Sequence, residues 1–155
     1  MNLYLVQHGE ATTEEEDPLR PLSDEGRANV TKVARYVSQN MNIKLRKIFH
    51  SEKTRAVQTA RILADHLVPS NGIGTADGLL PNNDPQQWAD RLKKERGDIM
   101  LVGHLPHLKR LAALLVLGDA ERQFIRHCNA GILCLTQDES GAWLINWILN
   151  PQMTK

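Results

Sequence analysis

The chain has 155 residues, of which 41% are hydrophobic and 24% are charged. This composition can form a core, so a wholly disordered chain is excluded, and the length predicts a single domain over residues 1–155. The 19 basic and 18 acidic residues leave a formal charge of +1, which argues against general binding to nucleic acid or to a membrane surface.

The cysteine content and the N-terminus favour a cytoplasmic protein. Cys128 and Cys134 are the only cysteines, too few for a disulfide framework in a chain of this length. The apolar start Met1–Val6 is far shorter than a signal-peptide core. The longest apolar run, Leu111–Leu117, is far below the ~18 residues that a membrane helix needs. We therefore expect a soluble, cytoplasmic protein.

The first half of the chain predicts two strands, each followed by a helix. Leu3–Val6 is an apolar run typical of a buried strand, and the acidic stretch Thr12–Asp17 after it indicates a solvated loop. Ser23-Asp24-Glu25 predicts the start of a helix that ends at Asn40–Asn42. Lys47–His50 predicts a second strand. Ser51 is expected to cap the helix that follows this strand. The two helices present apolar residues at helical spacing: Val30, Val33, Ala34 and Val37 in the first, and Ala56, Ala60, Leu63 and Leu67 in the second.

The second half predicts four further strands and two helices. Pro69–Asp84 is an irregular crossing with a short strand near Ile73, and Asp84-Pro85 begins a helix that runs to about Arg96. Ile99–Val102 is the clearest buried strand, and Pro106 opens the apolar helix that contains Leu108–Leu117. Two late strands form an antiparallel hairpin around Gln137–Gly141, with Trp143 and Trp147 on one face by strict alternation: Gly131–Leu135 and Trp143–Ile148.

This alternation of strands and helices over Leu3–Leu117 predicts an α/β fold, a three-layer sandwich around a mainly parallel sheet. Two of the strands end alike, in Gln7-His8-Gly9 and in Gly103-His104. In open α/β sheets, ligands bind outside the carboxyl ends of the strands. If both strands are central and parallel, His8 and His104 lie at the same edge and form a candidate site. Alternatively, each is an ordinary loop histidine.

Two arginines are expected at the same edge of the sheet. Arg55 lies in the first turn of the helix after the second strand, where free backbone N–H groups also attract anions, and Arg20 lies in the loop after the first strand. Guanidinium groups bind phosphate oxygens in bidentate fashion. A neutral imidazole can attack phosphorus and form a covalent phosphohistidine. The sequence therefore predicts a phosphoryl-transfer site.

Three segments resemble the histidine phosphatase superfamily: Leu5–Glu10, Ser51–Ala60 and Val102–Pro106. The short length, the brief middle region and Arg20-Pro21-Leu22-Ser23 resemble its SixA-type phosphohistidine phosphatases. The resemblance implies a phosphoglycerate-mutase-like fold and a metal-independent phosphatase without a cofactor. It also implies a signalling role and a phosphohistidine-bearing protein, such as a phosphotransfer domain, as the partner of a monomeric enzyme.

The same resemblance assigns roles to individual residues. His8 matches the nucleophile that becomes phosphorylated, Arg55 the second phosphate-clamping arginine, and His104 the second histidine of the pocket. Arg20 lies where SixA-type proteins carry a further arginine. Gly9 would let the backbone approach the phosphate closely.

The chain departs from the family pattern at one position. The family carries Arg-His-Gly, whereas here Gln7 replaces the arginine. A glutamine amide donates a neutral hydrogen bond, so a weaker phosphate clamp is expected. No clear general acid is present, and Asp77 and Asp84 in the middle region are only weak candidates for that role. An imidazole leaving a labile P–N bond would need little acid catalysis.

Three other interpretations remain open. Gln7 could mark a module that binds phosphorylated partners without turnover. A phosphatase of small phosphate esters is disfavoured by the short segment Pro69–Asp84, because a small metabolite needs a lid to bury it. A metal site at His8, His104 and His107 lacks a fourth ligand in the sequence, so no metal is expected.

Overall fold

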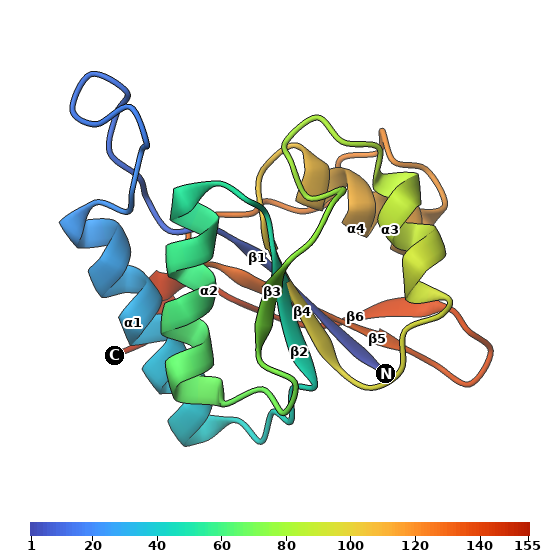
Figure 1. Ribbon diagram of the computed structural model, residues 1–155. Coiled ribbons are helices and arrows are strands. Elements are labelled where there is room, and N and C mark those ends of the chain that lie inside the picture. Colours follow the sequence, from blue (N-terminus) through green and yellow to red (C-terminus); the bar gives the residue numbers. More distant parts are fainter.

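The computed structural model describes all residues 1–155 and contains one six-stranded sheet in the order β3-β2-β4-β1-β5-β6 (Figure 1). Strands β1 to β4 are parallel, and β5 runs antiparallel to β1 and to β6. The strands span Asn2–Gln7 (β1), Lys47–His50 (β2), Ile73–Thr75 (β3), Ile99–Gly103 (β4), Ile132–Gln137 (β5) and Trp143–Leu149 (β6). The predicted parallel sheet and the late hairpin are confirmed.

Helices cover both faces of this sheet and make a three-layer sandwich (Figure 1). Helices α1 (Asp24–Asn40) and α2 (Thr54–Leu67) pack on one face, and α3 (Pro85–Leu92) and α4 (His107–Leu117) pack on the other. A 3-10 turn, η1 (Pro151–Met153), follows the last strand. None of the helices combines the length and the apolar character needed to span a bilayer.

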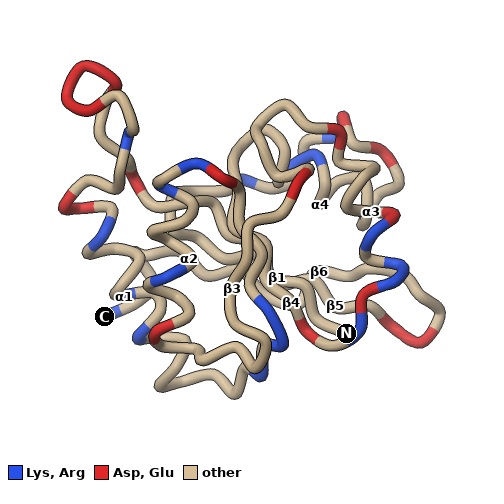
Figure 2. The backbone as a smooth tube through the Cα atoms, in the orientation of Figure 1, with Lys and Arg blue, Asp and Glu red and all other residues tan.

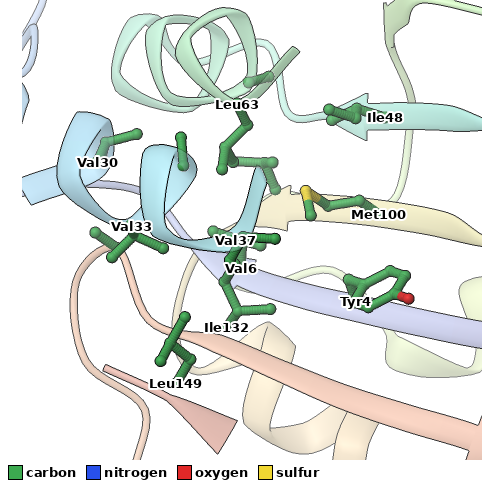
Figure 3. Close-up of a cluster of buried hydrophobic side chains, with 14 of the residues drawn as sticks. Tyr4, Val6, Val30, Val33, Val37, Ile48, Leu63, Met100, Ile132 and Leu149 are labelled. Atoms are coloured by element: carbon green, nitrogen blue, oxygen red, sulfur yellow. The ribbon is translucent and has the colours of Figure 1, made fainter. Parts of the chain in front are cut away.

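The central strands are buried on both sides, which explains their continuous apolar sequences. Along β1, Tyr4 and Val6 face α1 and α2, whereas Leu3 and Leu5 face α3 and α4. In the first of these two cores, the valine stripe of α1 meets side chains from the sheet and from α2 (Figure 3). This packing holds the ends of β1, β2 and β4 firmly in place, and the candidate site lies at those ends.

The predicted common face of Trp143 and Trp147 is wrong. Trp143 packs in the core under α3 and α4, whereas Trp147 lies on the opposite face, with its ring centroid 5.8 Å from that of Tyr4. The cause is a β-bulge: Cys134 pairs with Trp147 but Leu135 pairs with Ile145, so one residue of β6 is skipped. An extra residue reverses the inward and outward alternation of the strand.

Two predicted helix ends also need correction. The helix predicted to run to about Arg96 ends at Leu92 and continues only as turns. Ser51 does not cap α2, because Lys53 is the N-cap and no side chain caps this helix. The hydroxyl of Ser51 instead contacts a histidine of the candidate site.

Candidate active site

The candidate site lies where β1, β2 and β4 end side by side. The backbone N–H of His8 donates to the carbonyl of Gly103 at 3.1 Å, and that of Ser51 donates to Val102 at 3.1 Å. These bonds tie the three strand ends together. They bring the rings of His8 and His104 to a centroid distance of 4.9 Å, which confirms that the two histidines share one edge of the sheet.

His8 is held as a neutral imidazole with its Nε2 lone pair presented to the site. Its Nδ1 lies 2.7 Å from the carbonyl oxygen of Gly9, which can only accept, so Nδ1 carries the proton. The Nε–H of Arg55 donates to His8 Nε2 at 3.2 Å. Burial lowers the pKa of His8 to about 4. The Gly9 hydrogen bond opposes this shift, and the positive charges of Arg55 and Arg20 add to it. The atom expected to attack phosphorus is therefore unprotonated near neutral pH.

Thr59 supports this arrangement and was missed at the sequence level. Its hydroxyl accepts a hydrogen bond from the Gly9 N–H at 3.0 Å and donates one to the carbonyl of Arg55 at 2.7 Å. Thr59 thereby anchors the backbone N–H of Gly9, the residue whose carbonyl orients His8. The available signal was its spacing, because residues four apart on a helix lie on the same face as each other: Thr59 follows Arg55 by one turn.

The glycine at position 9 is required for a different reason from the one predicted. A Cβ there would lie 2.7 Å from Val30 Cγ2, 2.9 Å from Leu22 Cδ2 and 3.0 Å from the carbonyl oxygen of Gly26. The side of Gly9 that lacks a side chain thus faces α1. Its N–H and its carbonyl are already bonded to Thr59 and His8. Gly9 therefore allows α1 to pack closely and positions the nucleophile through its carbonyl.

His104 is buried to 2% exposure beside His8. Its Nε2 lies 2.6 Å from Ser51 Oγ, while its Nδ1 is buried without a hydrogen-bond partner. Burial lowers the pKa of His104 to about 3, and the positive charges that His8 and Arg55 can carry act in the same direction. Both rings of the pair are thus neutral, and one ring nitrogen of His104 is left for a ligand.

Arg20 reaches the site from the loop between β1 and α1. It adopts a left-handed backbone conformation with φ 46°, and its Nε–H donates to the carbonyl of Thr12 at 3.1 Å. Arg20 and Arg55 line the same polar pocket of about 380 Å³ together with Glu14, Pro18, Leu19, Glu52, Lys53 and Thr54. Figure 2 shows that this loop carries its acidic residues at a projecting tip.

The two arginines line one pocket, as predicted, and Lys53 adds a third cation beside the carboxylates of Glu14 and Glu52. Burial lowers the pKa of Arg55, and the charge of Arg20 lowers it further. Like charges held close together in a folded protein are unfavourable without a counter-anion. A phosphate dianion would relieve this repulsion and accept hydrogen bonds from both guanidinium groups.

Gln7 is placed at the end of β1, but its amide turns toward the segment before β5. Its Nε2 donates to Asn129 Oδ1 at 3.0 Å, and its buried Oε1 has no hydrogen-bond partner. The backbone carbonyl of Gln7 accepts from Ala130 N–H at 3.0 Å. Asn129 lies 122 residues from Gln7 in the chain, and no local sequence pattern links the two positions.

Neither candidate general acid bonds to the histidine pair. Asp84 caps α3 by accepting from Gln86 N–H at 2.9 Å. Asp77 lines a separate hollow of about 240 Å³ between β3 and α3. The alternative metal site is not formed, because no group of three or more His, Cys, Asp or Glu side chains is placed to hold an ion.

A sequence model of the histidine phosphatase superfamily (branch 1) matches residues 3–78. That stretch contains His8, Arg20 and Arg55. Arg55 bonds to His8 and lines a pocket together with Arg20. Residues 3–78 therefore carry the sequence pattern of the histidine phosphatase superfamily. Members of that superfamily are phosphatases and mutases, so the match supports a phosphatase-type hydrolase role.

Solved structures show the same fold. The protein histidine phosphatase SixA, complexed with tungstate, superposes with a TM-score of 0.86 at 23% identity over 99% of each chain. The α-ribazole phosphatase from Shigella flexneri gives a TM-score of 0.77 at 16% identity, covering 97% of this chain and 96% of that one. A mutant phosphoserine phosphatase from Entamoeba histolytica, in complex with phosphoserine, gives 0.68 at 17% identity, covering 97% and 98%. A search of curated proteins found no match to this sequence.

Proposed function

We propose that this protein removes phosphate from a protein phosphohistidine through a covalent phosphohistidine on His8. The observation that carries the proposal is the state of His8: a neutral ring, oriented by Gly9, with Nε2 directed at a guanidinium group. Such a nitrogen can attack phosphorus directly, without a separate base to remove a proton. Neither step of the reaction requires a metal ion.

The reaction proceeds in two displacements. In the first, His8 Nε2 forms a bond to phosphorus while the P–N bond of the substrate breaks, and the leaving imidazole takes the electron pair and a proton from solvent. In the second, water attacks the phosphorus on His8, the Nε2–P bond breaks, and inorganic phosphate departs. Arg55 and Arg20 stabilise the charge on the phosphoryl oxygens in both steps.

Arg55 has to change partner during this cycle. In the ligand-free protein its Nε–H bonds to the lone pair that must attack. A phosphoryl group entering the pocket offers the guanidinium a charged acceptor, which is a stronger partner than a neutral imidazole. Arg55 therefore leaves Nε2 as the substrate binds, and the nucleophile becomes free only when its target is present.

The openness of the site favours a protein substrate. The pocket that holds both arginines is lined almost entirely by polar residues, and they come from a loop and the start of a helix at the rim. Ligand pockets for small molecules bury most of the ligand against apolar walls. A phosphohistidine displayed on another protein, such as a phosphotransfer domain, can reach this rim without a lid.

Hydrolysis of a small phosphate ester is the second candidate. Its support is the structural likeness to proteins named as α-ribazole phosphatase and phosphoserine phosphatase. An alcohol is a poorer leaving group than an imidazole and needs a proton from a general acid. Asp84 is committed to its helix cap, so ester hydrolysis is expected to be the slower reaction.

The test compares phosphate release from a phosphohistidine protein and from p-nitrophenyl phosphate. Wild type should release phosphate from the first much faster, and radiolabel should be trapped as an acid-labile adduct. His8→Ala should abolish both the release and the adduct, whereas His66→Ala, at the far end of α2, should retain both. Faster ester hydrolysis would favour the second candidate. Phosphate binding without an adduct or release would establish a binding module.

A further inference from the structure

His104 has one bonded and one free ring nitrogen, and a buried hydroxyl decides which of them carries the proton. Ser51 is 1% exposed, and its Oγ lies 2.6 Å from His104 Nε2. The same oxygen accepts a hydrogen bond from the Lys53 N–H at 3.3 Å. No other acceptor is within hydrogen-bond reach of the Ser51 hydroxyl.

Two arrangements of protons are possible for this contact. If Ser51 O–H donates to Nε2, then His104 Nδ1 carries the ring proton, and only that N–H lacks a partner in the ligand-free protein. If Nε2–H donates to Ser51, then the serine O–H and the Nδ1 lone pair are both left unpaired in a buried place. Each buried unpaired polar group costs on the order of 1–3 kcal/mol, so the first arrangement is favoured.

We propose that Ser51 is a positioning residue that holds His104 in its Nδ1–H tautomer, so that the ring presents a donor to the phosphoryl group. This inference rests on the proposed phosphoryl transfer at His8, whose ring centroid lies 4.9 Å from that of His104. A phosphoryl dianion bound between the two rings accepts from a donor, whereas it would be repelled by a lone pair. The opposite tautomer would oppose binding and catalysis.

The backbone keeps Ser51 in register for this task. Its N–H donates to the Val102 carbonyl at 3.1 Å, two residues before His104 on the neighbouring strand end. At the start of the following helix, the Lys53 N–H donates to the Ser51 hydroxyl oxygen. This bond uses a lone pair of the oxygen and leaves the Ser51 hydroxyl proton free to be donated to His104. The single segment from Ser51 to Thr59 therefore orients both imidazoles, His104 through Ser51 and His8 through Thr59.

Long-range ¹H–¹⁵N NMR correlation of the ligand-free wild type tests the tautomer directly. The His104 signals are assigned as those that disappear in His104→Gln. The expected result is a pyrrole-type shift for Nδ1 and a pyridine-type shift for Nε2. The reverse pattern would overturn the proposal. This measurement requires no substrate, so its result does not depend on whether the proposed reaction occurs.

Variants then link the tautomer to function. Ser51→Ala should give a mixture of tautomers, bind tungstate more weakly, and lose about tenfold in phosphate release, the scale of one lost hydrogen bond. Ser51→Thr keeps the hydroxyl and should restore both the Nδ1–H signal and most of the activity, and Ser38→Ala on α1 serves as the control. Equal losses in the alanine and threonine variants, with an unchanged His104 spectrum, would refute the role of the hydroxyl. If Ser51→Ala fails to fold, the wild-type spectrum alone decides.

Discussion

Replacing Gln7 by arginine should strengthen the phosphate site. Gln7 donates a neutral hydrogen bond to Asn129 and leaves its Oε1 buried without a partner, so its amide contributes little charge to the pocket. A charge-assisted hydrogen bond contributes about 1.5–3 kcal/mol and a neutral one about 0.5–1.5 kcal/mol. The difference, on the order of 1 kcal/mol, corresponds to a five- to tenfold rise in kcat/KM.

The structure also shows what limits this gain. An arginine at position 7 can still donate to Asn129 Oδ1, so that contact need not be lost. It would add a third guanidinium group beside Arg55 and Arg20, which already share one pocket. The repulsion among the three guanidinium groups destabilises the ligand-free state more than the phosphate-bound state, because the phosphate dianion compensates the added positive charge. The gain should therefore be largest at low ionic strength.

The assay is phosphate release from a phosphohistidine protein as a function of substrate concentration for Gln7→Arg, Gln7→Met and wild type. Gln7→Met keeps the side-chain length and removes the amide, so it measures what the glutamine contributes. It should lose about threefold. A folded Gln7→Arg that is less active than wild type would refute the reasoning, because Gln7 would then have a role of its own rather than being a weakened clamp.

Four further expectations follow from the geometry. Arg55→Ala and His104→Ala should each lower kcat/KM by about 10²–10³-fold, the scale of a lost transition-state donor, and near-wild-type rates would contradict their roles. Thr59→Val keeps the side-chain shape and removes the hydroxyl, so it should lower kcat roughly tenfold without changing the circular dichroism spectrum. An unchanged kcat would show that Gly9 does not need the hydrogen bond from Thr59. Because the folded-state pKa of His8 is about 4, below its ordinary value, activity should stay level down to about pH 5 and fall as His8 gains a proton near pH 4; loss centred near pH 6.5 would contradict a neutral, buried ring. Burial lowers the pKa of His107 to about 4, so between about pH 6.5 and pH 4 the unfolded chain binds a proton that the folded chain does not. The free energy of unfolding therefore falls as the pH drops through this range. His107→Leu should reduce this pH dependence by up to about 1.4 kcal/mol per pH unit, as measured by urea titrations.

The sequence by itself was sufficient for the architecture and for placing His8 and His104 at one edge of the sheet. Apolar runs such as Leu3–Val6 and Ile99–Val102 predict strands buried on both faces, and these strands are central in the sheet. A parallel sheet gathers the residues that follow its strands at one edge. This is why His8 and His104, 96 positions apart in the sequence, could be expected together before any geometry was known.

Local patterns could not decide the contacts that depend on packing between distant segments. The bulge in β6 separates Trp143 from Trp147, although strict alternation places them on one face. Ser51 has the sequence context of a helix cap, but its hydroxyl is used by His104 from another strand end.

Tertiary structure likewise decided what Gly9 and Gln7 do. Gly9 is a glycine because α1 packs against it, and Gln7 turns toward Asn129, which a distant loop supplies. A hydrogen bond or a close contact between distant segments depends on where the whole fold places two backbones, to within a few tenths of an ångström. Hydrophobic periodicity carries no such information, because it reports only which face of an element is buried.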